Sequence, residues 1–147
     1  SYWTEKANMQ ASWTNSIQET IWNKYMFITA FSGLTTAADV TTSAILQVNT
    51  AKNLFIQILH EMKQIAQAEG ISLTEKDVKS AIKTIEQLPD DATSSMHQDF
   101  RKGLSIELEH LQGHALELAQ THQLVAPILE TIYGIIRAKV YQNVGIN

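Results

Sequence analysis

The sequence contains no cysteine among its 147 residues. This absence excludes disulfides, thiol nucleophiles and zinc sites built on thiolates, and it only weakly indicates a compartment. Proline is nearly absent as well, since only Pro89 and Pro127 occur, and the six glycines are scattered. Long stretches without the residues that interrupt helices favour an all-α protein.

Two further absences exclude whole classes of partner. No apolar run reaches the ~20 residues that a membrane-spanning helix needs. The formal net charge is -4 and the basic residues form no cluster, so nothing marks a surface for nucleic acid or an anionic membrane. We therefore expect no nucleic-acid partner and no membrane partner, and a cytoplasmic location is compatible with the composition.

What is present is the composition of a globular domain. Hydrophobic residues make up 44% of the chain and charged residues 18%, and the length is that of one ordinary domain with its own core. The sequence opens at Ser1 without an initiating Met, which suggests a chain processed or cut from something longer. We expect residues 1–147 to form a single helical domain.

Apolar positions recur at intervals of three and four, which is the helical period. The pattern predicts a first helix over about residues 16–34, with Gly33 near its end and a turn or short helix over 35–43. A second helix from residue 50 ends before Gly70. Its apolar stripe consists of Leu54, Phe55, Ile58, Leu59, Met62, Ile65 and Ala66.

Three more helices are predicted in the second half. Ser72 and Glu75 have capping-box spacing, and Pro89 ends the helix that follows them. A fourth helix follows residues 94–96 and carries an apolar stripe to about residue 120. A last helix runs over about residues 127–140, with Pro127 in its first turn.

Lys24 is the first candidate for chemistry, because it lies in an otherwise apolar segment on the same helical face as Ile28 and Ser32. One interpretation is that its methylenes cover apolar surface while its ammonium stays in water. The other is that it lines a semi-buried cleft, where partial desolvation would make the ammonium a useful general acid. The spacing alone leaves both open.

Two other candidates also have ordinary explanations. Glu107, His110 and His114 share a helical face at a spacing that could present them to a metal, but matching carboxylates on partner helices are missing, so we expect no metal site. Ser94 and Ser95 could supply a nucleophile, yet no triad pattern surrounds them and a helix N-cap is the simpler interpretation.

Five segments together resemble a known family. They are WNK at residues 22–24, SGLT at 32–35, SSM with QD at 94–99, ELE with a glycine at 107–113, and AQTHQLVAP at 119–127. In order and spacing this set resembles the C-terminal domain of ketopantoate reductases. The resemblance implies an all-α, multi-helix fold of the ketopantoate reductase and 6-phosphogluconate dehydrogenase C-terminal type.

The resemblance also implies roles for individual residues. Lys24 would be the catalytic lysine that protonates the ketone oxygen, and Glu107 would contact the substrate or the cofactor ribose and help to orient the lysine. Ser95 would bind the substrate carboxylate, and Ser32 would face the substrate. Departures from the family pattern are Ile28 and Thr42, which stand where asparagines are expected, and Ile106, which replaces a common threonine.

The expected function is therefore that of the C-terminal half of an NADPH-dependent enzyme that reduces ketopantoate, or a related 2-oxo acid, in pantothenate and coenzyme A synthesis. The resemblance implies that NADPH is bound mainly by an N-terminal Rossmann domain absent from this chain, so the isolated chain should be inactive. We expect a homodimer. The alternative is a non-catalytic helical module for dimerisation or partner binding.

Overall fold

Helices are the only regular elements in residues 2–144, the part of the chain that the computed structural model describes. The all-α class predicted from sequence is confirmed. In chain order the elements are α1 (Tyr2–Ala38), α2 (Thr42–Gln47), α3 (Asn49–Ala68), α4 (Glu75–Glu86), α5 (Ser95–Arg101), the π-helix η1 (Glu109–Gly113), α6 (His114–Thr121) and α7 (Pro127–Val144).

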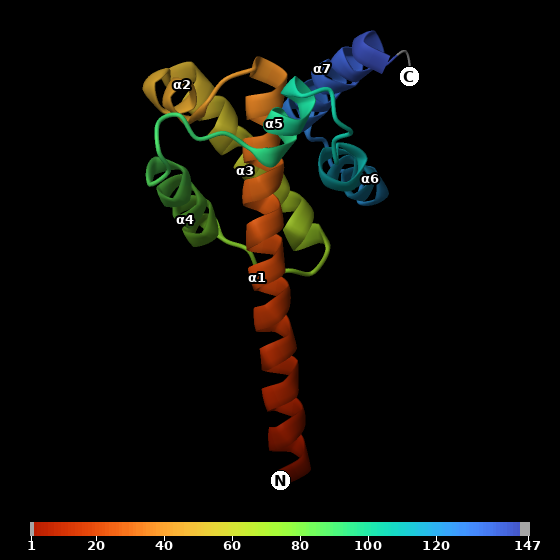
Figure 1. Cartoon of the computed structure of the whole chain (residues 1–147). Helices are drawn as coiled ribbons and strands as arrows, with labels where there is room; N and C mark the ends of the chain where they lie inside the picture. The colour runs from red at the N-terminus through yellow and green to blue at the C-terminus, as the bar shows by residue number, and fades with distance from the viewer. Residues whose placement is uncertain (1, 145–147) are drawn as a thin grey trace.

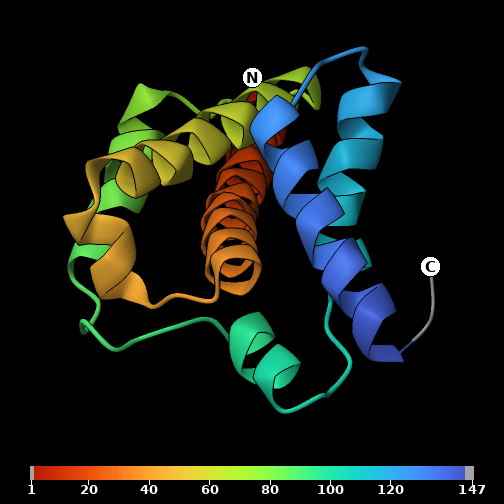
Figure 2. The same ribbon diagram turned by 90° about the horizontal axis from the view of Figure 1, so that it is seen from above.

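The long helix α1 is the axis of the fold and also projects beyond it (Figure 1). Seen from above, α1 is viewed nearly end-on, and α3, α5 and α7 surround its C-terminal half (Figure 2). Every residue from 29 to 37 is buried, whereas residues 2–18 are exposed. A helix that is buried all round needs neighbours on every side, and the other helices provide them.

The predicted stripe on α3 supplies much of the core. Phe55, Ile58, Leu59 and Met62 are fully buried, because this face of α3 packs against α1 and α7. Leu54 was expected in the stripe but is exposed, since it lies at the edge of the buried face.

The predicted bounds of the first helix are wrong at both ends. Residues 2–15 contain no Pro or Gly and several good helix formers, so the helix begins at Tyr2. Gly33 does not end it. A Cβ at Gly33 would lie 3.1 Å from Ile132 Cγ2 and 3.2 Å from Gln112 Nε2, so this glycine lets α7 and η1 approach α1 closely.

The actual end of α1 is made by Asp39 and by a side chain from α7. Asp39 has φ 57°, a left-handed conformation typical of the residue that follows a helix, and Val40 N–H donates to Thr35 O at 3.2 Å. Lys139 Nζ donates to Thr36 O and Ala37 O at 3.1 and 2.9 Å. These contacts satisfy carbonyls that the helix end leaves unpaired.

The capping box of α4 lies two residues later than predicted. Thr74 is the N-cap, in an extended conformation, and Thr74 N–H donates to Asp77 Oδ2 at 2.8 Å. Ser72 and Glu75 have the right spacing but do not form the box, because the helix begins only after Thr74.

The single helix predicted from residue 95 to about 120 is wrong, since the chain breaks it at Gly103. That glycine has φ +72°, which ends α5, and residues 104–108 form a loop before η1 and α6. Leu104, assigned to the apolar stripe, is exposed. The break creates the wall of the candidate site described below.

The final helix begins at Pro127 as predicted and continues to Val144, four residues beyond the expected end. Glu61 on α3 accepts from Ile128 N–H and Leu129 N–H at 3.0 and 2.8 Å, which anchors the start of α7. Within residues 2–144, none of the helices combines the length and hydropathy that crossing a membrane requires.

Candidate active site

Two adjoining hollows lie along one side of α1, where α5, the 102–108 loop and η1 face it. The first, of about 330 Å³, is lined by Ile28, Phe31, Ser32, Thr93, Ser94, Ser95, Met96, Asp99, Glu107 and Leu111. The second, of about 440 Å³, is lined by Ile21, Trp22, Lys24, Tyr25, Ile28, His110, Leu111 and His114. Ile28 and Leu111 border both hollows, so the two hollows adjoin; we call the pair the groove.

Lys24 is exposed and borders the second hollow, and it also borders a third hollow between α1 and α4. It makes no ion pair or side-chain hydrogen bond within residues 2–144, so its ammonium is free to contact another molecule. Asn23, its neighbour, donates to Asp77 Oδ1 at 3.1 Å and ties this turn of α1 to α4. This contact holds the backbone at Lys24 in place, next to Ile28 at the border between the two hollows.

Tyr25 on α1 holds η1, the helix on the other side of the groove, in place. Its hydroxyl donates to Leu111 O at 2.7 Å, and its ring contacts Trp22 edge-on with centroids 5.2 Å apart. Burial raises the pKa of the Tyr25 phenol well above its ordinary value, so the hydroxyl remains a neutral donor. This bond holds η1 against the turn of α1 that carries Lys24.

Glu107 lies in the loop before η1 and lines the first hollow. Its Oε2 is 3.2 Å from His110 Nδ1, and 75% of its side chain is exposed. The expected attraction between Glu107 and Lys24 does not take the form of an ion pair in the described structure. The two residues line adjoining hollows instead, on opposite sides of the boundary formed by Ile28 and Leu111.

The two serines at the start of α5 have different surroundings. Ser94 is the N-cap, as the capping interpretation predicts: its Oγ accepts from His97 N–H at 3.1 Å and lies 2.7 Å from Thr35 Oγ1. Ser95 is exposed, lines the first hollow and forms no side-chain hydrogen bond within the described residues. Ser95 is therefore the serine whose hydroxyl is available to a ligand.

Ser32 also lines the first hollow, and its hydroxyl oxygen already accepts one hydrogen bond within the protein. Gln112 Nε2 donates to Ser32 Oγ at 2.9 Å and to Thr29 O at 2.8 Å. Gln112 is fully buried and belongs to the π-helix η1, a wide turn that often occurs at functional sites. Sequence reasoning missed Gln112, because no spacing pattern reveals a contact between residues 80 positions apart.

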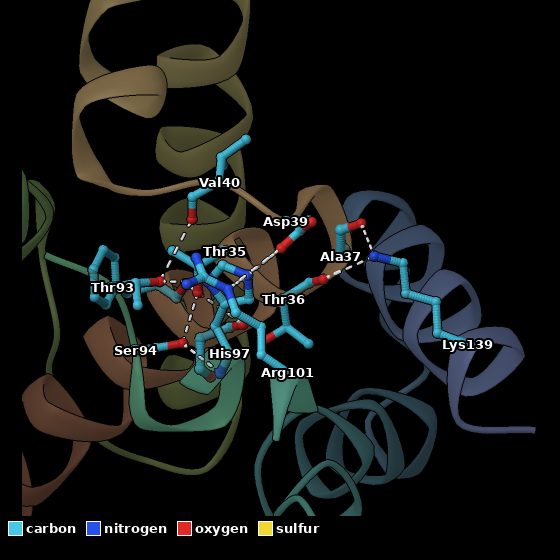
Figure 3. A network of polar contacts seen from close by, with 12 residues as sticks. Thr35, Thr36, Ala37, Asp39, Val40, Thr93, Ser94, His97, Arg101 and Lys139 are labelled. Carbon is cyan, nitrogen blue, oxygen red and sulfur yellow. Dashed lines mark hydrogen bonds and ion pairs between the residues drawn. The ribbon is translucent and has the colours of Figure 1, made fainter. Parts of the chain in front are cut away.

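Behind the serines lies a polar network that sequence reasoning also missed (Figure 3). His97 is fully buried; its Nε2 lies 2.5 Å from Asp39 Oδ1, and its Nδ1 lies 2.7 Å from Thr93 Oγ1. Because an ionised carboxylate can only accept, His97 Nε2 donates to Asp39, and Nδ1 pairs with the Thr93 hydroxyl. The network joins the end of α1 to the segment that carries the serines.

Ile28 and Thr42, the two positions where the family pattern has asparagines, lie in different parts of the structure. Ile28 lies at the boundary between the hollows, in contact with both. Thr42 is fully buried away from the groove, and its hydroxyl donates to Ala92 O at 2.8 Å. Of the two, only Ile28 can contact a ligand bound in this groove.

Metal binding receives no support from the arrangement. Among residues 2–144, no group of three or more His, Asp and Glu side chains is placed to hold a metal ion. Glu107 and His110 contact each other, but Glu107 precedes the helix on which a shared face had been predicted.

The fold and the groove define an all-helical domain with a cavity large enough for a small molecule. Residues 16–140 match the family described as ketopantoate reductase PanE/ApbA C terminal. The chain belongs to this family, and the resemblance noted in the sequence is confirmed.

Individual relatives agree with this assignment. The chain is 30% identical to the uncharacterized oxidoreductase YkpB of Bacillus subtilis over 118 residues, or 80% of this chain and 39% of that protein. It is 28% identical to the 2-dehydropantoate 2-reductase of Halobacterium salinarum over 129 residues, or 88% of this chain and 42% of that protein. The chain thus spans about two fifths of the length of these relatives.

Solved structures agree as well. The dimeric ketopantoate reductase from Staphylococcus aureus superposes with a TM-score of 0.81 at 28% identity, covering 86% of this chain and 44% of that one. D-mandelate dehydrogenase in ternary complex with NADH and anilino(oxo)acetate superposes with a TM-score of 0.76 at 23% identity, covering 85% and 41%, a likeness that shows the fold alone.

Proposed function

We propose that this chain is the substrate-binding and catalytic half of a reductase that converts a 2-oxo acid such as ketopantoate to the 2-hydroxy acid, using NADPH. The observation that carries the proposal is the meeting of Lys24, Ser95, Ser32 and Glu107 from three separate segments in one groove. Membership in the ketopantoate reductase family supports it. Under this proposal the parent protein is a cytoplasmic enzyme of pantothenate and coenzyme A synthesis.

The dinucleotide would be held mainly by another part of the parent, because this chain lacks what such a site needs. Residues 2–144 contain no strand, and the sequence has no glycine-rich turn between a strand and a helix. We propose an N-terminal Rossmann domain for that part. The isolated chain should therefore neither bind NADPH tightly nor turn over substrate.

When bound, the nicotinamide supplies the hydride that reduces the ketone carbon. Lys24 donates the proton that the developing alkoxide oxygen requires, and its positive charge polarises the carbonyl before transfer. The free Ser95 hydroxyl donates to the substrate carboxylate. Glu107, at the edge of the groove, accepts from a hydroxyl of substrate or of the cofactor ribose.

Steady-state kinetics on the full-length parent test the proposal. NADPH oxidation should depend on an added 2-oxo acid, and the product should be the corresponding 2-hydroxy acid. Absence of turnover with ketopantoate and with a panel of other 2-oxo acids would overturn the proposal. The same assay on this chain alone should give no activity.

A second candidate function is a helical module for dimerisation or partner binding without chemistry. The observation that favours it is the exposed apolar side chains on the projecting half of α1, including Trp3, Met9 and Trp13. Self-association through such a surface would also fit a dimeric reductase. A parent without reductase activity but with a stable dimer would favour this second function.

A further inference from the structure

We propose that Gln112 is a positioning residue of the reductase: it holds the hydroxyl of Ser32 as a hydrogen-bond donor toward the first hollow, where Ser32 and Ser95 share the substrate carboxylate. The inference rests on the proposed function and adds to it a residue that acts through Ser32. It follows from the fixed orientation of a buried amide, from the role that this amide leaves to Ser32, and from the hydrogen-bonding chemistry of a 2-oxo acid.

The side-chain amide of Gln112 is fully buried, and a backbone carbonyl fixes its orientation. Gln112 Nε2 lies 2.8 Å from Thr29 O and 2.9 Å from Ser32 Oγ. A carbonyl oxygen can only accept, so the atom that contacts Thr29 O is the NH2 group of the amide. An amide NH2 group has two N–H donors and no acceptor. The second N–H therefore donates to Ser32 Oγ.

Two further observations indicate that this contact is more than incidental packing. Gln112 Oε1 is buried without a hydrogen-bond partner within residues 2–144, which is uncommon in native structures because such an oxygen lowers stability. Gly33 leaves the room that the amide needs, since a Cβ there would lie 3.2 Å from Gln112 Nε2. The fold thus keeps a polar side chain at this position of η1, although an apolar one would avoid the unpaired oxygen.

The amide leaves Ser32 with one role toward a ligand. Ser32 Oγ accepts from Gln112, and no acceptor for the Ser32 O–H is found among the described residues. A hydroxyl has one proton to donate. Because Ser32 is buried and lines the first hollow, that proton is available to an acceptor bound there.

The reactive end of a 2-oxo acid needs such donors, because its carboxylate and keto oxygens only accept hydrogen bonds. Asp99 and Glu107 line the same hollow, but an ionised carboxylate also only accepts. Their negative charge opposes a bound carboxylate, so its binding depends more strongly on the donors that the hollow provides. Within residues 2–144, Ser32 and Ser95 are the hydroxyls of this hollow whose protons are unpaired, one for each carboxylate oxygen.

Kinetics of the full-length parent with its best 2-oxo acid test the inference. Ser32→Ala removes the donor, and we expect kcat/KM to fall by about 10- to 100-fold, the range for a hydrogen bond to a charged group. Gln112→Met keeps a long unbranched side chain but removes both N–H donors, so the Ser32 hydroxyl is no longer held and kcat/KM should fall by about 10-fold. Both losses should appear in KM with kcat little changed, because the carboxylate is bound alike in the ground state and the transition state.

The double variant separates a positioning role from a merely structural one. If Gln112 acts through Ser32, Gln112→Met should change kcat/KM by less than about 2-fold in the Ser32→Ala background. An equal loss in both backgrounds would mean that Gln112 only supports the fold, and it would overturn the inference. Gln120→Met is the control, the same change at an exposed glutamine of α6 that borders neither hollow, and it should leave KM unchanged.

The outcomes separate the inference from the function on which it rests. A Ser32→Ala parent with wild-type KM would overturn the inference and leave the reductase function standing, and this variant decides the matter even if Gln112→Met does not fold. A folded Gln112→Met parent with wild-type KM would overturn the role of Gln112. No turnover of any 2-oxo acid by the wild-type parent would overturn both the reductase function and the inference.

Discussion

At the residue scale, Asp39 has two tasks in this fold. Its left-handed conformation ends α1, and its carboxylate accepts from the buried His97, which also pairs with the Thr93 hydroxyl. The hydrogen bond from His97 lowers the pKa of the Asp39 carboxyl below its ordinary value of 3.8, and the charge of Arg101, 3.6 Å away, adds to this. The ionised form is therefore the one that the native state prefers.

The stability of the fold should depend on this carboxylate in a defined pH range. The pKa of Asp39 is lower in the native state than in the unfolded chain. The ionised carboxylate therefore contributes its full stabilisation above pH 3.8, and this stabilisation is lost as the pH falls through the native-state pKa of Asp39. Asp39→Asn should lower the free energy of unfolding near neutral pH by at most about 1 kcal/mol, since Asp39 is exposed. Urea unfolding of both proteins should give converging values near about pH 2; a difference that is constant with pH would contradict the assignment.

Sequence reasoning reached some site residues and not others for a physical reason. Lys24, Ser95 and Glu107 were found from local segments that resemble a family, and the structure places them around one groove. Gln112 and His97 act through contacts with residues 80 and 58 positions away, respectively. Such pairs depend on helix packing, which a single sequence does not reveal.

At the element scale, α3 shows how periodicity predicts both a helix and its buried face. Its core side chains recur at three and four positions, and the face they form packs on α1 and α7. The break at Gly103 was missed because apolar residues on both sides of it continue an apparent helical period. A positive φ at one glycine overrides that period, and the resulting loop carries Glu107 into the groove.

Ile58 tests the importance of the buried face of α3. Ile58→Ala removes three buried methyl and methylene carbons from a fully buried position, so the free energy of unfolding should fall by about 2–5 kcal/mol. Gln57→Ala, the adjacent exposed position, should change it by no more than about 0.5 kcal/mol. Chemical denaturation of the two variants measures both values; equal effects would mean that the face of α3 is wrongly assigned.

At the scale of the whole molecule, α1 is unusual because half of it has no neighbours among the described residues (Figure 1). Trp3, Met9 and Trp13 on this half are 74%, 73% and 71% exposed. Apolar surface of this kind drives association when it is contiguous. The projecting half of α1 was not predicted, because the sequence shows helix propensity there but not the absence of a packing partner.

We expect this chain to self-associate through the projecting half of α1. Light scattering across a concentration series should give an apparent mass that rises above that of a monomer. In the double variant Trp3→Glu with Trp13→Glu, the protein concentration at which half of the chains are associated should be at least about 10-fold higher. The reason is that burying a charge without a partner is costly. Asn8→Glu, at an exposed position on the opposite face of the same helix, is the control; a monomer at all concentrations would contradict the expectation.

The most direct test of the account is the rate of NADPH oxidation by the full-length parent with its best 2-oxo acid, compared with Lys24→Ala. The control is Lys76→Ala, which removes an exposed lysine of α4 that borders neither hollow. If Lys24 is the general acid, kcat should fall by about 10²–10⁴-fold in Lys24→Ala and stay near wild type in the control. A Lys24→Ala enzyme with a kcat equal to that of the control would contradict the central claim.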